Sequence, residues 1–199
     1  MKNALKITVA ALCCVALVAC SQRGPAEAAL TAAQAAVDGV KADAGKYVPD
    51  QAKALMASLL AAREAFDKGD YKAATEMAQA IPAKAKDVAA AVAARKDELT
   101  KSWSALATSV PGMIEQIRVK VDALSAMKKL PKDMDAARLD AAKASLSDIT
   151  KSWGEASGAF KSGNLIDANA KGNAVKAKAR KLSCDMGHGY VSVNADYRS

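Results

Sequence analysis

The sequence predicts an all-α protein, an elongated antiparallel helical bundle built from two related helix-turn-helix units. Apolar side chains recur at alternating steps of three and four residues along most of the chain, which is the period of a helix and not of a strand. Alanine, the strongest helix former, occupies 43 of the 180 positions after residue 19. A shift of 94 residues also places one apolar stripe on another. We therefore expect a helical bundle with a narrow core over residues 26–183.

The repeat rests on pairs of similar residues that stand 94 positions apart. These pairs are Leu55 with Ile149, Leu59 with Trp153, Ala62 with Ala156, Phe66 with Phe160, Gly69 with Gly163, Ala74 with Ala168, Ile81 with Val175, Lys84 with Lys178, and Val88 with Leu182. Two copies of one helix-turn-helix unit, with a glycine at each turn, explain the pattern. The alternative is a chance alignment of alanine-rich amphipathic helices.

The first 19 residues have the three parts of a signal peptide. Lys2 and Lys6 precede an apolar run over residues 7–19, which is too short for a bilayer core that needs about 20 apolar residues. The run ends in Leu-Val-Ala-Cys at Cys20, which resembles the lipobox of bacterial lipoprotein precursors. That resemblance implies cleavage before Cys20 and a diacylglyceryl group on its thiol, usually with an N-linked acyl chain such as palmitate. The alternative is an ordinary secretory signal that happens to contain cysteines.

A lipidated Cys20 predicts a membrane anchor, because two or three acyl chains hold a protein at a bilayer where a single chain does not. The resemblance to Gram-negative lipoproteins, with Ser21 and not aspartate after the cysteine, implies the periplasmic face of the outer membrane. Residues 20–25 are expected to form a short linker between the anchor and the bundle.

The first hairpin is expected over residues 49–109, after an alanine-rich helix at about 25–46. Lys68-Gly69-Asp70 ends its first helix, and Asp70 can cap the second. Pro82 lies within the second apolar stripe and should bend or break that helix, because proline lacks the backbone donor and clashes with the preceding turn.

A central helix is expected over residues 111–129, with Pro111 in its first turn. The second hairpin then covers 133–183, with Asp133 or Asp135 as the N-cap of its first helix. The apolar period ends near residue 183, which predicts an irregular tail over 184–199.

The segment from Phe66 to Ala74 resembles the glycine turn of tetratricopeptide helix pairs. It is still more similar to the helical-hairpin domain of alanine-rich bacterial envelope lipoproteins of unknown function, and Trp153, Phe160 and Gly163 extend that likeness over about residues 46–183. The period of 94 residues, and not about 34, disfavours a stacked superhelix. The resemblance implies no activity and no functional residues.

The inventory of reactive side chains predicts no enzyme, no cofactor and no metal site. His188 is the single histidine, so a histidine-rich metal site cannot be formed, and we expect no catalytic triad. Cys184 and His188 offer only two of the four ligands of a closed zinc site. After processing and lipidation, Cys184 keeps the last free thiol, which could form an intermolecular disulfide.

Basic side chains gather in the last predicted helix. Between residues 167 and 181 the only acidic residue is Asp167, and the basic residues are Lys171, Lys176, Lys178, Arg180 and Lys181. The helix macrodipole stabilises cations near a helix C-terminus, so helix capping and solvation explain these basic residues without a ligand. The alternative is contact with anionic lipid head groups or another acidic envelope polymer. Nucleic acid is not expected, because the export signal removes the chain from it and interleaved aromatic residues are absent.

Two hypotheses about function follow. The first is a structural or adaptor lipoprotein of the cell envelope whose helical faces bind another envelope protein or a second copy, because long apolar stripes are typical of helix pairing. The second is a periplasmic carrier or chaperone for an amphipathic or anionic ligand, held in a groove lined by Trp103, Met113, Met127 and Trp153. Core packing is the alternative for those four side chains.

Overall fold

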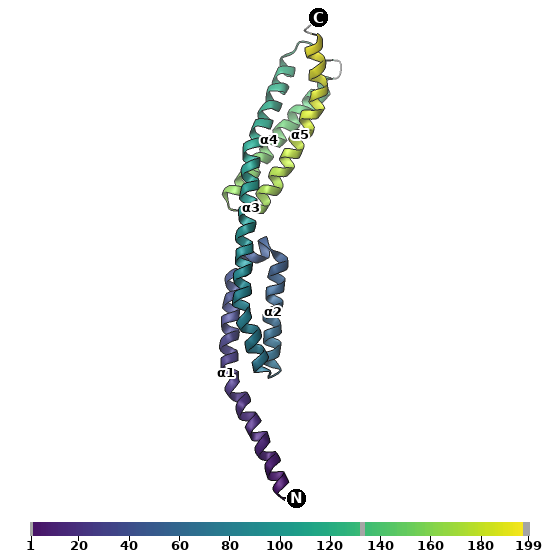
Figure 1. Ribbon diagram of the computed structural model, residues 1–199. Coiled ribbons are helices and arrows are strands. Elements are labelled where there is room, and N and C mark those ends of the chain that lie inside the picture. Colours follow the sequence, from purple (N-terminus) through teal and green to yellow (C-terminus); the bar gives the residue numbers. More distant parts are fainter. Residues whose placement is uncertain (1, 132–133, 197–199) are drawn as a thin grey trace. The chain divides into compact units, whose positions relative to one another are not determined.

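The computed structural model describes the backbone of residues 2–131 and 134–196, and the side chains of residues 22–131 and 134–186. The helices in chain order are α1 (Lys2–Tyr47), α2 (Pro49–Asp67), α3 (Tyr71–Ala126), α4 (Ala136–Lys161) and α5 (Leu165–Asp196) (Figure 1). No strand occurs in these described ranges. The prediction of an all-α helical bundle is confirmed.

The chain divides into two compact units, residues 1–95 (unit 1) and residues 96–199 (unit 2), with the boundary inside α3. Unit 1 holds α1, α2 and the first part of α3, and unit 2 holds the rest of α3 with α4 and α5. Each unit therefore combines one helical hairpin with a third helix that precedes the hairpin in the chain.

The two hairpin turns share one hydrogen-bond pattern. Gly69 N–H donates to the Phe66 carbonyl at 2.9 Å, and Gly163 N–H donates to the Phe160 carbonyl at 2.9 Å. The N–H of the next residue donates to a carbonyl five residues earlier in both turns, which is the Schellman motif. The motif requires a left-handed residue, and Gly69 (φ 81°) and Gly163 (φ 78°) supply it at no steric cost. The predicted glycine at each turn is confirmed.

Aspartates cap two of the helices as predicted. The Ala73 N–H donates to the Asp70 carboxylate at 3.0 Å at the start of α3, and the Arg138 N–H donates to the Asp135 carboxylate at 2.7 Å at the start of α4. Of the two residues proposed to cap α4, Asp135 does so, and Asp133 lies outside the described residues.

The prediction of a separate central helix over residues 111–129 was wrong, and Pro82 does not break its helix. The second helix of the first hairpin and the expected central helix 111–129 are one continuous helix, α3, which passes through Pro82 and Pro111 without a break. A proline inside a helix costs about 3 kcal/mol. Pro111 and Ala107, whose carbonyl loses its partner, are both exposed, so water can replace the missing bond. The buried stripe continues on both sides of each proline, and its burial offsets that cost.

The expected tail and the expected linker are helical as well. The segment 184–196 continues α5, and residues 20–25 lie within α1. Leu182 and Met186 are both buried, so the three-and-four period of α5 extends past residue 183. Within α1, Pro25 is exposed and removes only one backbone donor. Residues 197–199 lie outside the described part.

The two units bury different kinds of side chain. Unit 1 buries fifteen described apolar side chains, of which eight are alanine, whereas unit 2 buries eighteen, of which four are alanine. The core of unit 2 is one cluster from α3, α4 and α5 that includes Trp103, Ile117 and Ile149. Unit 1 is therefore held by closely approaching small residues, and unit 2 by large ones.

Candidate functional site

The aromatic side chains that were expected to line a ligand groove pack against one another in unit 2. Trp103 is 6% exposed and stacks on Trp153, with ring centroids 5.2 Å apart and an interplanar angle of 7°. It also stacks on Phe160, at 4.9 Å and 11°. Met113 and Met127 are partly buried against the same core cluster. These contacts favour core packing over a ligand groove for the four residues.

Helix α5 approaches this aromatic group at Gly172, which is buried. A Cβ at this position would lie 2.9 Å from Leu106 Cδ1 and 3.3 Å from Trp103 Cζ3. A methyl group at this position would therefore have to displace Leu106 and the edge of Trp103, so close packing and not backbone conformation favours glycine here. This role was not predicted from the sequence, although a glycine inside a helical stripe can have a packing reason.

One buried polar side chain accompanies the close approach. Asn169 is 5% exposed, and its Nδ2 donates to the Leu99 carbonyl of α3 at 2.9 Å and to the Leu165 carbonyl at 2.8 Å. Its Oδ1 is buried and accepts no hydrogen bond from any described group. Asn169 therefore ties α5 to α3, and sequence reasoning did not single it out.

The basic side chains of α5 are separated by the structure into two groups. Lys171 pairs with Asp167 at 2.9 Å, and Lys178 pairs with Asp148 of α4 at 2.8 Å. The hydrogen bond and the charge of Asp167 raise the pKa of Lys171 above its ordinary value. Two of the five predicted anion contacts are therefore partly neutralised within the bundle.

The other three basic residues differ in exposure: Lys176 is half-buried, whereas Arg180 and Lys181 are exposed. Lys181 lines a shallow groove of about 470 Å³ between α4 and α5, together with Lys178, Asp148 and Asp185. Two acids balance the two lysines there, so this groove has no net charge.

A groove between α3 and α4 has a different charge balance. It measures about 550 Å³ and is lined by Arg118, Val121, Asp122, Lys143, Leu146, Ser147, Thr150 and Lys151. It is not apparent from the sequence, because its cations come from two helices, α3 and α4, that are distant along the chain. Three cations face one carboxylate in this groove.

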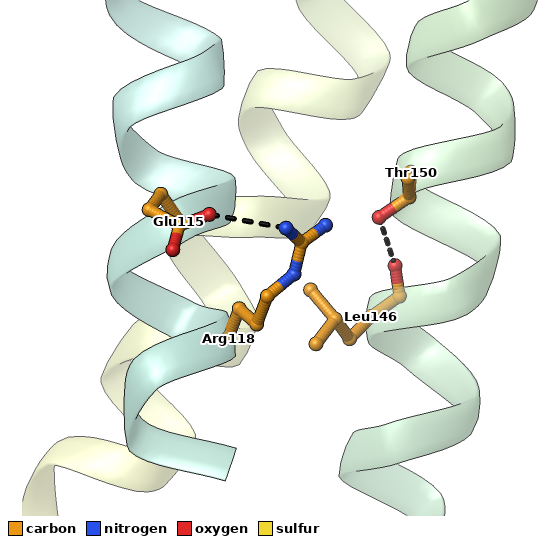
Figure 2. Close-up of polar contacts among 4 residues, drawn as sticks. All are labelled: Glu115, Arg118, Leu146 and Thr150. Atoms are coloured by element: carbon orange, nitrogen blue, oxygen red, sulfur yellow. Dashed lines mark hydrogen bonds and ion pairs between the residues drawn. The ribbon is translucent and has the colours of Figure 1, made fainter. Parts of the chain in front are cut away.

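Figure 2 shows how Arg118 reaches from α3 toward Leu146 and Thr150 of α4. Its Nη1 lies 3.2 Å from the Glu115 carboxylate, and both side chains are about half exposed or more. The Thr150 hydroxyl donates to the Leu146 carbonyl at 2.8 Å, so its oxygen can still accept a hydrogen bond. The guanidinium therefore lies at the mouth of the groove, in an exposed ion pair with Glu115.

Unit 1 has a smaller groove of about 270 Å³ between α1 and α2, lined by Gln34, Val37, Asp38, Lys41, Met56, Leu59, Leu60 and Arg63. Arg63 donates to Gln34 Oε1 at 2.7 Å and so joins the two helices. Leu60 is 59% exposed at the edge of this groove.

The remaining predicted residues are described only in part. Cys184 is exposed and free, as an intermolecular disulfide would require. Met186 is buried in the core of unit 2, and the side chains of His188 and Cys20 lie outside the described set. Among the described side chains, no three His, Cys, Asp or Glu residues gather where they could hold a metal ion. Within the described ranges, no helix is both long and apolar enough to cross a membrane.

Comparison of the chain with protein-family models, with curated proteins and with solved structures gives no match. The geometry above is therefore the basis for the proposals that follow.

Proposed function

We propose that this chain is a lipoprotein anchored through Cys20 at the periplasmic face of the outer membrane, where its helical bundle acts as an adaptor that binds another envelope protein. The anchor rests on the lipobox at residues 17–20, and the adaptor role rests on the surface of the bundle.

One observation carries the adaptor role. The stacked aromatic residues and the methionines near them are used in the core of unit 2, while the grooves described above lie open between neighbouring helices and carry charged side chains at their edges. Open surfaces between rigid helices suit contact with a protein segment, whereas small-molecule sites are usually concave and mostly apolar.

The anchor is tested by metabolic labelling with palmitate and by fractionation of membranes. We expect label in the wild-type protein and none in Cys20→Ala, with the variant lost from the outer-membrane fraction. An unlabelled wild-type protein, or a Cys20→Ala variant that stays equally membrane-bound, would overturn the anchor.

The adaptor role is tested by crosslinking in intact cells that express the lipidated chain at its natural level. We expect a crosslinked species that contains a second protein and that persists when the cells are diluted before crosslinking. Recovery of the monomer alone would overturn the adaptor role.

A specific observation favours a second candidate, a carrier of an amphipathic anion. A hollow of about 500 Å³ at the far end of α4 and α5 is lined by Met134 and Met186 beside Leu182 and Arg138. Methionine adapts to ligands of varied shape, and the volume is within the range of ligand pockets. Calorimetric titration with a lysophospholipid tests it, with Ser145→Trp to fill the hollow and Ser147→Trp in the α3–α4 groove as the control. Binding that only Ser145→Trp removes supports the carrier, and equal binding by both variants argues against it.

A further inference from the structure

The α3–α4 groove is the most cationic of the four grooves described above. Its lining has three cations and one carboxylate. The α4–α5 groove and the methionine-lined hollow each balance cations with an equal number of acids, and the groove of unit 1 has an excess of one cation. We propose that the α3–α4 groove is the docking surface for an acidic amphipathic helix of the partner protein. This inference rests on the adaptor function proposed above and names the chemistry of the partner.

The cations of this groove are available to a ligand. Among the described side chains, the ion-pair partners of Arg118 and Lys143 lie on their own helices, Glu115 at 3.2 Å and Asp140 at 3.5 Å, and all four side chains are about half exposed or more. Exposed pairs of this kind contribute little to stability, so a partner carboxylate can replace them at little cost. Lys151 is exposed and has no ion-pair partner among the described side chains.

The spacing of the cations favours a linear ligand over a single compact anion. Lys143, Ser147 and Lys151 lie on one face of α4, and the two lysines are eight residues apart, which corresponds to about 12 Å along the helix. Arg118 lines the same groove from α3. A partner helix with two carboxylates about two turns apart can meet both lysines, whereas one phosphate group cannot reach both at hydrogen-bond distance without bending both side chains.

The floor of the groove is apolar. Val121 is 3% exposed, and Leu146 is partly buried against the core of unit 2. An aliphatic side chain between the two carboxylates of the partner would cover this floor, as in other complexes where an amphipathic helix lies in a groove.

The charge of unit 2 favours an acidic partner over a second copy of this chain. Residues 96–199 contain 17 basic and 12 acidic residues, and residues 20–95 contain 10 basic and 9 acidic residues. Two copies would therefore repel each other at this surface, and an acidic protein would be attracted to it.

The test uses the full lipidated chain in neutral detergent micelles and a designed helical peptide. The peptide carries two glutamates eight residues apart on either side of a leucine, and its twin carries lysines in their place. We expect the glutamate peptide to bind at least about tenfold more tightly than the twin, and the affinity to fall as salt is raised. The triple variant Arg118→Gln, Lys143→Gln, Lys151→Gln should weaken binding about tenfold.

A matched control removes the same charge elsewhere on unit 2. The variant Lys176→Gln, Arg180→Gln, Lys181→Gln should change the affinity less than about twofold. Reversal of the groove charges in Arg118→Glu, Lys143→Glu, Lys151→Glu should transfer preference to the lysine peptide, which a misfolded variant could not do.

Three results would overturn the proposal: equal affinity for the two peptides, an equal loss in the groove and control variants, or displacement of the glutamate peptide by short-chain phosphatidylglycerol but not by phosphatidylcholine. The last result would instead make the groove a lipid site. Crosslinking in cells separates the two proposals, because a crosslink that the groove variant leaves intact preserves the adaptor role while the groove is excluded.

Discussion

Units 1 and 2 share their order of helices and their hairpin turn, but they are stabilised by different cores. Positions 20–95 contain 26 alanines among 76 residues, and positions 96–199 contain 17 among 104. The buried set follows this difference, since unit 1 has seven buried side chains larger than alanine and unit 2 has fourteen. Because burial of a large aliphatic side chain contributes about 1.5–3 kcal/mol, unit 2 gains far more from burial. One helical plan thus tolerates two packing solutions.

The aligned positions Ala78 and Gly172 show how the second solution is reached. Ala78 is fully buried in unit 1, and the residue 94 positions later is Gly172, where an added Cβ would lie 3.3 Å from Trp103 Cζ3 and 3.7 Å from Trp153 Cζ3. The bulk that Trp103 and Trp153 add to unit 2 is accommodated by removing a methyl group from α5. Larger side chains on α3 and α4 are therefore matched by a smaller residue on α5, and the order of the helices stays the same.

The largest expected effect compares the aligned pair Leu55 and Ile149, which are both almost completely buried. Substitution of either by alanine should cost about 2–5 kcal/mol of the free energy of unfolding. Unit 1 has fewer large side chains to lose, so Leu55→Ala should abolish slow amide exchange in α2, whereas Ile149→Ala should only accelerate it in α4. Native-state hydrogen exchange measures both. If the amides of α2 in Leu55→Ala are as protected from exchange as those of α4 in Ile149→Ala, the two cores are equally stable and the comparison fails.

A smaller effect is expected where the units differ by one methyl group. Gly172→Ala should cost about 1–3 kcal/mol, because its Cβ would meet Leu106 and Trp103 at distances that force the core to shift. Gly154→Ala, in the same bundle with no atom near its Cβ, should stabilise the helix by about 0.5–1 kcal/mol. Denaturant unfolding of both variants tests this, and a stabilised Gly172→Ala would contradict the close packing.

The two hairpin turns should respond alike. Gly69→Ala and Gly163→Ala each place a Cβ in the left-handed region, which costs about 1–2 kcal/mol. The two losses, measured by thermal or denaturant unfolding, should agree to within about 0.5 kcal/mol if the turns are equivalent. Gly112→Ala within α3 is the control and should lose no stability. Unequal losses of stability in the two variants would show that the turns share a hydrogen-bond pattern but are not energetically equivalent.

The smallest effect concerns charge. Lys171 stands where unit 1 has the exposed Met77, and Asp167 raises the pKa of Lys171. Asp167→Asn should lower that pKa toward its ordinary value of 10.5, as measured by NMR titration of the lysine side chain. The folded pKa exceeds the unfolded one, so the small stabilisation is fully present below the unfolded pKa and is lost as the pH rises through the folded pKa. An unchanged titration would show that the ion pair does not form in solution.

The fold class, the hairpin turns and the caps could be predicted from sequence because each depends on local chemistry. Helical periodicity, glycine at a left-handed position and aspartate at an N-cap act within a few residues. The continuity of α3 could not be predicted in this way. Proline at position 82 or 111 is a local signal against a helix, and the burial of the stripe on both sides is a tertiary effect that outweighs it.

The end of α5 was missed for a related reason. Gly187 and Gly189 indicate an irregular segment, yet Val175, Ala179, Leu182 and Met186 continue the buried stripe to the last described side chain. If the apolar period of α5 had been followed over a longer stretch of sequence, the predicted helix would have extended past residue 183.

The candidate groove was missed because it is a property of packing. Arg118 and Lys143 are 25 residues apart in the chain, and they line one groove because α3 and α4 contribute to it together. The sequence does show the basic run of α5, but the structure reveals that Lys171 and Lys178 already have carboxylate partners there.

The stacked indoles have a practical consequence for spectroscopy. The chain contains only two tryptophans, and both belong to the pair in unit 2. Intrinsic tryptophan emission will therefore report the melting of that unit alone, and it will be blind to unit 1, which must be followed through its tyrosines or its helical circular dichroism. An unfolding curve recorded by indole emission and one recorded at a helical wavelength will coincide only if both units melt together.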